Sequence, residues 1–288
     1  MATILDTLKK GAEYLQRHEV DEARLNMEWL IAHVLKVGRM QLYLDFDRPL
    51  TEPQIATLRE LTVRRGRGEP LQHLLGTVEF CDLEFFTDSR ALIPRPETEE
   101  LCRHLLSLTW PEEAALLDMG CGSGVIGLSL AHHLAARGGA RVTLADLSPE
   151  ALSLARENAD RLLPRSPVLT FLESDLFAEL GDASYDLIVA NLPYVPRGSE
   201  TALSREVLRD PPLALYGGDS GLEVMERFLE AAPRHLRPGG KIAMEFGIEQ
   251  GRPLARLAEE RGLAEVILRP DISGIERFLF ATQTPEPC

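Results

Sequence analysis

The chain has 288 residues, of which 44% are hydrophobic and 26% charged, and its formal net charge is −14. This balance is typical of a water-soluble globular protein, no apolar run reaches the ~18 residues of a membrane span, and no secretory leader is visible, so we expect a cytoplasmic protein. A strongly acidic chain repels a phosphate backbone, so direct binding of nucleic acid is not expected.

Residues 1–73 are predicted to form a small all-helical domain. Apolar residues recur there at helical spacing. They are Ile4, Leu5, Leu8 and Leu15, followed by Ala23, Met27, Leu30, Ile31, Val34 and Leu35. Thr51 and Gln54 have the spacing of a capping box, which predicts a further helix from residue 52. The basic cluster at 64–68 is predicted to be a solvated helix end.

Residues 74–95 are predicted to form a β-hairpin or an extended linker. The stretch "LLGTVEFCDLEFFTD" is rich in aromatic and β-branched residues and has a short polar break in its middle. The stretch "IPRPETEEL" then places two prolines ahead of an acidic helix start. Residues 96–288 are predicted to form the second and larger domain.

Apolar runs that are predicted to be strands alternate with helical segments from residue 114 onward. The runs cover residues 114–119, 141–146, 167–174, 185–190, 241–246, 264–270 and 277–282. This alternation predicts an α/β fold with a doubly wound, mostly parallel sheet of seven strands. Only residues 271–276 separate the last two strands, which is too short for a parallel crossover, so the last strand is predicted to be antiparallel.

A glycine loop follows the first of these strands, in the stretch "LLDMGCGSGVIG". Gly120, Gly122 and Gly124 permit a tight turn there and let backbone N–H groups approach a ligand near a helix N-terminus. Asp118 precedes the loop, where a carboxylate would attract a cationic amino-acid moiety and repel a pyrophosphate. We therefore expect the loop to bind S-adenosylmethionine rather than a dinucleotide, although a GxGxxG string also begins at Gly122.

Two acidic residues follow the next two strands. Asp146 ends the second strand, just before a helix that starts at Ser148 and Pro149, and an acid at this place can bind both hydroxyls of a ribose. Asp175 follows the third strand, where its side chain can accept a hydrogen bond from an adenine amino group or, alternatively, cap a helix.

The stretch "ANLPYVP" ends the fourth strand, and its prolines hold the backbone extended. Carbonyl groups in such a turn lack a local donor and can accept hydrogen bonds from a planar NH2 group. We expect the Asn191 side-chain oxygen to accept one N–H and the carbonyl of Leu192 or Pro193 to accept the other, with Tyr194 as an aromatic wall. An amide nitrogen is a poor nucleophile, so this positioning would carry the rate of methylation. A proline turn with a helix-capping asparagine is the alternative.

These motifs resemble those of a known family. "NLPY" is similar to the Asn/Asp-x-Pro-aromatic motif of methyltransferases that modify planar NH2 groups on adenine, cytosine or glutamine. With "LIPRPETE", "LLDMGCGSGVIGLSLA", "DPPLALYGGDSGLEVMERFL" and "DISGIERFLFA", nearly the whole chain resembles the bacterial release-factor glutamine methyltransferases (the HemK/PrmC family). The resemblance implies a Rossmann-like methyltransferase domain behind a helical domain that grips the substrate protein.

The resemblance also implies the reaction. A methyl group would pass from S-adenosylmethionine to the side-chain nitrogen of the glutamine in the GGQ loop of class I peptide-chain release factors, which act in translation termination. The predicted catalytic residues are Asn191, Pro193 and Tyr194. The predicted cofactor-binding residues are Gly120, Cys121, Gly122, Ser123, Gly124, Asp146, Asp175, Leu176 and Asn191. The residues predicted to enclose the glutamine are Asn191, Leu192, Pro193 and Tyr194.

The chain departs from the family pattern at three places. Leu192 stands where relatives often have proline, and its backbone carbonyl can still accept a hydrogen bond. Leu176 stands where several relatives have tryptophan, which implies a weaker wall for adenine. Arg209 and Asp210 stand where an aromatic residue and glutamate are usual, so the role of that loop stays open.

Three other functions stay open from the sequence. A glutamine methyltransferase of a ribosomal protein would share the asparagine turn but not the match around "IPRPETE". A DNA adenine methyltransferase is disfavoured by the acidity and by the lack of a basic recognition domain. A regulatory protein that binds S-adenosylmethionine without turnover would not need Asn191.

Two further patterns suggest chemistry that we do not expect here. "GGDSG", at 217–221, contains a string found in serine proteases, but it is predicted to be a loop turn. The cysteines form no CxxC pair and are predicted to be free thiols without a metal. They are Cys81, Cys102, Cys121 and Cys288.

Overall fold

The computed structural model describes residues 2–164, 166 and 168–284. The chain folds into two compact units. The helical unit comprises Met1–Thr77 together with Ser204–Arg209, and the sheet unit comprises Val78–Leu203 together with Asp210–Cys288. The domain boundaries at 73 and 95 stay predictions. None of the described helices is long and apolar enough to span a membrane.

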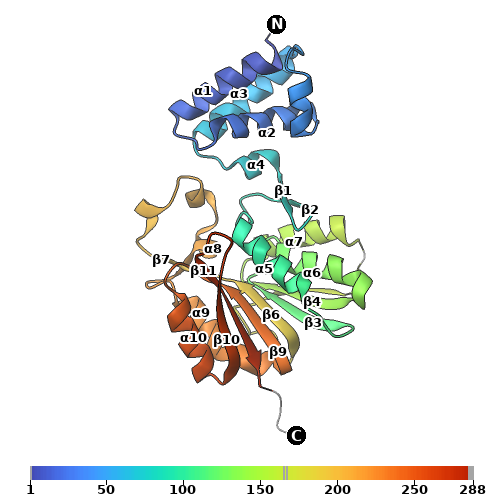
Figure 1. The fold of residues 1–288 in the computed structure, drawn as a ribbon, viewed down its shortest axis with the longest axis vertical. Helices are drawn as coiled ribbons and strands as arrows, with labels where there is room; N and C mark the ends of the chain where they lie inside the picture. The colour runs from blue at the N-terminus through green and yellow to red at the C-terminus, as the bar shows by residue number, and fades with distance from the viewer. Residues whose placement is uncertain (1, 165, 167, 285–288) are drawn as a thin grey trace. The chain divides into compact units, whose positions relative to one another are not determined.

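The helical unit forms around one apolar core. Its elements are α1 (Ile4–Arg17), α2 (Ala23–Leu35), the 3-10 helix η1 (Arg39–Leu44), α3 (Glu52–Gly66) and the short α4 (Leu71–Leu75) (Figure 1). The predicted capping box is present at the start of α3, where the Thr51 N–H donates to Gln54 Oε1 at 2.9 Å. Leu8, Leu30 and Leu58 come from three different helices and are each 0–1% exposed, as the predicted apolar faces require.

The basic cluster is not a solvated helix end throughout, and this part of the prediction is wrong. The Arg65 guanidinium is buried and donates to Asn26 Oδ1 at 2.6 Å and to Glu206 Oε1 at 2.5 Å. Glu206 belongs to Ser204–Arg209, the segment that joins this unit from far along the chain. A buried guanidinium needs such partners, and local sequence does not reveal a partner about 140 residues away.

The hairpin predicted within residues 74–95 is present. The strands β1 (Thr77–Phe80) and β2 (Leu83–Phe86) form a two-stranded sheet. Cys81 and Asp82 connect them, and both have positive φ values, 49° and 64°. That combination is the one a two-residue hairpin turn of the primed type requires.

The main sheet has seven strands in the order β10-β11-β9-β6-β3-β4-β5 (Figure 1). Their bounds are β3 (Ala114–Met119), β4 (Ala140–Asp146), β5 (Leu169–Glu173), β6 (Tyr185–Asn191), β9 (Leu236–Glu245), β10 (Leu263–Pro270) and β11 (Glu276–Gln283). The strands β9, β6, β3, β4 and β5 run parallel to one another. Strand β11 is antiparallel to both of its neighbours, β9 and β10. The predicted fold class is thus confirmed, including the antiparallel last strand. The start of the third predicted strand, at 167, lies outside the described residues.

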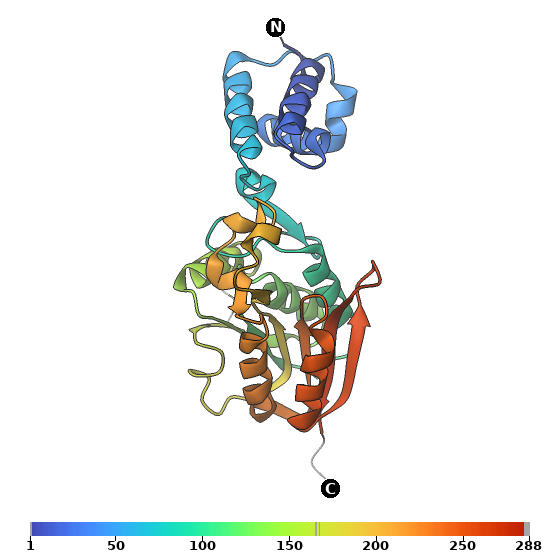
Figure 2. The ribbon, with the colours of Figure 1, turned by 90° about the vertical axis from the view of Figure 1, so that its left-hand side faces the viewer.

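Helices cover both faces of this sheet (Figures 1 and 2). One face carries α5 (Pro96–Ser107), α6 (Val125–Leu134) and α7 (Pro149–Leu162), and the other carries α9 (Glu223–Ala231) and α10 (Gly251–Glu260). Successive residues of a strand alternate between two cores: Leu116 packs with the first group of helices and Leu117 with the second. This burial on both sides explains why the parallel strands are continuous apolar runs.

Short elements complete the sheet unit. They are the 3-10 helices η2 (Ala135–Arg137), η3 (Glu200–Ala202) and η5 (Ala232–His235), the short helix α8 (Pro212–Leu215), and the paired strands β7 (Val195–Pro196) and β8 (Tyr216–Gly218). A further 3-10 helix, η4 (Val207–Arg209), lies in the segment that joins the helical unit.

Three of the cysteines lie in the described part of the chain. Cys81, Cys102 and Cys121 are buried free thiols, while Cys288 lies outside the described residues. Burial raises the pKa of the Cys121 thiol well above its usual value, which leaves it a poor nucleophile at neutral pH.

Candidate active site

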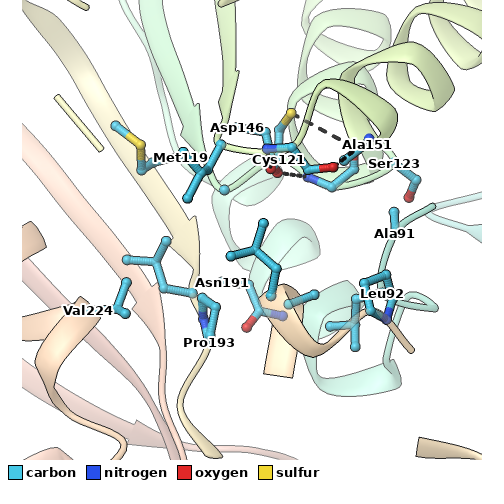
Figure 3. A pocket seen from close by; sticks show the side chains of 18 of the residues that line it. Ala91, Leu92, Met119, Cys121, Ser123, Asp146, Ala151, Asn191, Pro193 and Val224 are labelled. Atoms are coloured by element: carbon cyan, nitrogen blue, oxygen red, sulfur yellow. Dashed lines mark hydrogen bonds between the residues drawn. The ribbon is translucent and has the colours of Figure 1, made fainter. Parts of the chain in front are cut away.

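A pocket lies where the strand order reverses, at the carboxyl ends of β3 and β6. The chain runs from β3 to β4 and β5 on one side, then returns to β6 on the other side of β3. In open α/β sheets this reversal leaves a crevice in which ligands bind. Cys121 and Asp146 line one side of the pocket, and Asn191 and Pro193 face them from the other (Figure 3).

The glycine loop after β3 adopts a conformation that only glycine accepts without strain. Gly120, Gly122 and Gly124 have φ values of 68°, 54° and 82°, all in the left-handed region. The loop is anchored to β4, because the N–H groups of Gly120 and Cys121 both donate to the Ala145 carbonyl, at 2.8 and 3.0 Å. The glycines therefore give the pocket an anchored rim at which the backbone is open to a ligand.

Asp146 joins this loop to the next helix. Its Oδ2 accepts from the Gly122 N–H and its Oδ1 from the Ser148 N–H, both at 2.8 Å. Ser148 caps α7 as predicted, with its hydroxyl accepting from Ala151 N–H at 3.1 Å. Burial raises the pKa of the Asp146 carboxyl, and these N–H bonds oppose the rise. Each carboxylate oxygen retains a lone pair that can accept from a hydroxyl group in the pocket.

Asn191 is held by a chain of hydrogen bonds that runs from the pocket wall at Thr98 to Glu245, which does not line the pocket. Its Nδ2 donates to Thr98 Oγ1 at 2.9 Å, and the Thr98 hydroxyl donates to Glu245 Oε2 at 2.7 Å. The register of β6 on β9 explains the proximity, since Asn191 is paired with Glu245. Among the described residues none donates to Asn191 Oδ1, so this oxygen is the acceptor that the pocket offers.

The turn after Asn191 packs directly on the glycine loop. A Cβ added to Gly120 would lie 2.9 Å from Leu192 Cδ2, and the Leu192 side chain is 4% exposed. The Pro193 carbonyl faces Gly217 of β8, whose added Cβ would overlap it. The asparagine turn therefore lies between the glycine loop and β8, with backbone contacts on the β8 side.

Most of the predicted site residues are brought together in this pocket. Those that line it are Gly120, Cys121, Gly122, Ser123, Asp146, Asp175, Leu176, Asn191, Leu192 and Pro193. Gly124 and Tyr194 do not line it. Gly124 is instead the N-cap of α6 and lies against Leu144 and Ala155.

The prediction that Tyr194 forms an aromatic wall of the pocket is not met in this structure. Its ring packs against the core on the α9 side of the sheet, and its carbonyl accepts from Gln250 Nε2 at 2.9 Å. Burial raises the pKa of the Tyr194 phenol to about 12. The aromatic side chain of the turn thus fixes the backbone from behind.

The loop after β5 supplies the remaining predicted residues. The Asp175 carboxylate accepts from Arg227 Nη2 at 2.8 Å rather than capping a helix, since residues 176–179 form turns. Leu176 has a φ of 51° and its carbonyl accepts from the Ser174 hydroxyl at 2.6 Å. Both residues line the pocket.

Sequence reasoning missed the loop that closes the pocket from the other side. Pro211, Leu213 and Tyr216 line it, and Asp210 anchors the loop by accepting from the Ile93 N–H at 3.2 Å and from Arg95 Nη2 at 2.5 Å. The loop with no assigned role thus holds the segment before α5 in place. The stretches "LIPRPETE" and "DPPLALYGGDSGLEVMERFL" both resemble the family, but nothing in the sequence indicates that they contact each other.

Asp118 does not reach the pocket, so the prediction that it addresses a cationic ligand is wrong. It is 1% exposed, and its Oδ2 accepts from the Gly127 N–H of α6 at 2.8 Å. Burial raises the pKa of its carboxyl to about 7. The hydrogen bond from Gly127 opposes this rise, and the negative charge of Asp146 adds to it. Its role in the fold is to tie α6 to β3.

This shift predicts a pH-dependent stability. In the unfolded chain an aspartate has a pKa of about 3.9, so between about pH 4 and 7 the folded state holds more protons and stability falls as the pH rises. Asp118→Asn cannot ionise and should lack this loss. Its free energy of unfolding relative to the unchanged protein should therefore rise between pH 5 and pH 8, by up to ~1.4 kcal/mol per pKa unit, in urea titrations. The prediction would be contradicted if the free energies of unfolding of the two proteins differed by the same amount at every pH.

Comparisons with known proteins give the same picture over nearly the whole chain. Residues 6–76 match the PrmC N-terminal domain and residues 97–215 match the methyltransferase small domain. The release factor glutamine methyltransferase of Geobacter sulfurreducens is 40% identical over 278 residues, which cover 96% of this chain and 95% of the relative. That of Deinococcus radiodurans is 39% identical, with 96% and 97% covered. A methyltransferase from Pyrococcus furiosus shares the fold, with a TM-score of 0.51 and 18% identity over 70% of this chain and 89% of that one.

Proposed function

The chain belongs to the release factor glutamine methyltransferases, and on this premise we propose that it moves a methyl group from S-adenosylmethionine to the glutamine side chain of the GGQ loop in class I release factors. One observation of the site carries the proposal. Asn191 presents an oriented amide oxygen in the same pocket as the glycine loop and Asp146. A methyl-donor loop beside a fixed acceptor for an NH2 group is what amide methylation requires.

The residues on the donor side of the pocket fit S-adenosylmethionine. Asp146 has a free lone pair on each oxygen for the two ribose hydroxyls, and the rim from Gly120 to Gly122 allows close approach of a ligand. Leu147, Ala151 and Leu176 line the pocket and give apolar contacts for an adenine ring. When bound, the cofactor supplies a methyl group on a positively charged sulfur.

The acceptor side fits a primary amide. Asn191 Oδ1 would accept one N–H of the glutamine. The Pro193 carbonyl faces Gly217, so of the two backbone candidates we propose the Leu192 carbonyl as the second acceptor. Two accepted hydrogen bonds fix the nitrogen and increase its electron density, and the proton that it loses can leave after the methyl group has bonded.

We propose that the helical unit binds the body of the release factor. It offers exposed apolar side chains on α2 and η1, with Met40 70% and Leu44 84% exposed and Trp29 and Tyr43 each 41% exposed. Large exposed apolar side chains that gather on one part of a protein are typical of a protein-binding surface. The net charge of −14 disfavours nucleic acid as the substrate.

The proposal is tested by methyl transfer with labelled S-adenosylmethionine. We expect label on the GGQ glutamine of a purified class I release factor, located by peptide mass spectrometry, and none when that glutamine is replaced. Asp146→Ala serves as the control that removes the ribose-binding carboxylate, and it should weaken cofactor binding. Methyl transfer to a ribosomal protein or to DNA, without transfer to the release factor, would contradict the proposal.

A further inference from the structure

The hydrogen-bond chain behind Asn191 has a direction, and a buried carboxylate sets it. Glu245 is 2% exposed, ends β9 and does not line the pocket. An ionised carboxylate can only accept hydrogen bonds, whereas a hydroxyl has one hydrogen to donate and lone pairs to accept with. The Thr98 hydrogen is therefore committed to Glu245 Oε2, at 2.7 Å.

The consequence reaches the pocket through the Thr98 oxygen. With its hydrogen committed, this oxygen can only accept from Asn191, which must turn its NH2 group toward Thr98, as the 2.9 Å contact of Nδ2 shows. The amide oxygen then faces the substrate. If the carboxylate were absent, the Thr98 hydrogen could point at Asn191 instead, the amide could flip, and its NH2 would face the NH2 of the glutamine.

We propose that Glu245, acting through the Thr98 hydroxyl, is a positioning residue that determines which end of the Asn191 amide faces the substrate. The inference rests on the proposed function, since it assigns Asn191 Oδ1 as the acceptor for the glutamine. It adds two residues to the machinery of the reaction. Glu245 does not line the pocket, whereas Thr98 lines it beside Asn191, and both act in this inference by orienting the Asn191 amide.

The surroundings of Glu245 make this device sensitive to pH. Burial raises the pKa of its carboxyl to about 7, and Glu97 adds to the rise while Arg277 and Arg95 oppose it. Tyr194 also faces it, with a phenol that stays neutral because burial raises its pKa to about 12. A protonated Glu245 can donate to Thr98, which frees the Thr98 hydrogen. The kcat should therefore fall as the pH decreases through about 7.

Four variants test the inference in the full chain. Glu245→Gln and Thr98→Val should lower kcat at pH 8 by about 10- to 100-fold, the size of effect seen when a partner that orients a metal-binding side chain is removed. Thr98→Ser keeps the hydroxyl and should restore activity to within a few-fold. Thr87→Val is the matched control, because Thr87 is also buried and its hydroxyl has no partner among the described residues; its kcat should not change.

Three measurements separate positioning from general damage. Cofactor affinity by calorimetry should not change in Glu245→Gln, and the acidic limb of its kcat–pH profile should disappear while Asp118→Asn keeps that limb. In NMR spectra of the unchanged protein, the side-chain amide protons of Asn191, identified by their loss in Asn191→Ala, should be protected from solvent exchange, and Thr98→Val should remove the protection.

The outcomes distinguish this inference from the proposed function. No transfer to a release factor by the unchanged protein would overturn the proposed function, while the exchange measurement would still test the direction of the hydrogen-bond chain. Full transfer by Glu245→Gln with an unchanged acidic limb would overturn the inference alone. The inference alone would also be overturned if the Asn191 amide protons were as well protected from exchange in Thr98→Val as in the unchanged protein.

Discussion

Replacing Asn191 with alanine is expected to lower methyl transfer by about 100- to 1000-fold, the usual cost of removing one pre-positioned polar group that acts on the reacting atoms. The side chain offers its oxygen to the pocket and is fixed from behind by Thr98. Without it the glutamine nitrogen loses one of its two acceptors and the alignment that they give. The measurement is kcat with a saturating release factor.

Cofactor binding is the readout that gives this experiment its meaning. The donor side of the pocket is built from Gly120–Gly124 and Asp146, none of which depends on the Asn191 side chain for a hydrogen bond. Calorimetry with S-adenosylmethionine should therefore give an affinity within a few-fold of that of the unchanged protein. Loss of affinity in step with loss of activity would show that Asn191 serves the donor and not the acceptor.

Asn191→Asp is the matched variant. It keeps an oxygen toward the pocket but cannot donate to Thr98, and it places a second carboxylate close to Glu245. We expect it to retain more activity than the alanine variant and less than the unchanged protein. Equal activities of the aspartate and alanine variants would contradict a role for the side-chain oxygen.

The fold was largely predictable because local patterns determine it. Each parallel strand is buried on both faces and is therefore a continuous apolar run, so the seven runs found in the sequence became seven strands in the structure. The largest error in a boundary is in β9, which begins at Leu236 rather than at 241. The added part contains Pro238, Gly239 and Gly240, and a register shift between Tyr185 and Leu187 of β6 accommodates them as an irregularity.

The site was predictable only where its residues are neighbours in the sequence. The glycine loop and the asparagine turn each contain their own signal. Other residues act through partners that lie far along the chain, as Thr98, Glu245 and Asp210 do. No local sequence pattern indicates such pairs. Arg65 is the same case in the helical unit, since its burial depends on Glu206.

Tyr194 shows a second limit of sequence reasoning. The motif indicates that an aromatic ring is needed at this position, but it does not say on which side of the backbone the ring lies. In this structure the partly buried ring packs against the core, and the Tyr194 carbonyl accepts from Gln250 Nε2. A motif residue can therefore serve the reaction by fixing the backbone of its neighbours.

Gly217 gives a strong test of this view of the turn. It is buried in β8, its φ lies outside the left-handed region, and alanine is therefore conformationally acceptable there. An added Cβ would nevertheless overlap the Pro193 carbonyl oxygen, and it would lie 3.0 Å from the Pro193 carbonyl carbon and 2.6 Å from the Gly221 oxygen. These atoms are all backbone, so the turn must shift to admit a methyl group.

Gly217→Ala is thus expected to lower kcat by about 100-fold, since a displacement of roughly 1 Å at a reacting group has a cost of this size. Cofactor affinity should change little, because the substitution leaves Asp146 and its bonds to the glycine loop untouched. Gly38→Ala is the control: an added Cβ there meets nothing within 4 Å and φ is −66°. Activity of Gly217→Ala equal to that of the control, in a variant that unfolds at the same temperature, would mean that the position of the Pro193 backbone does not limit methyl transfer.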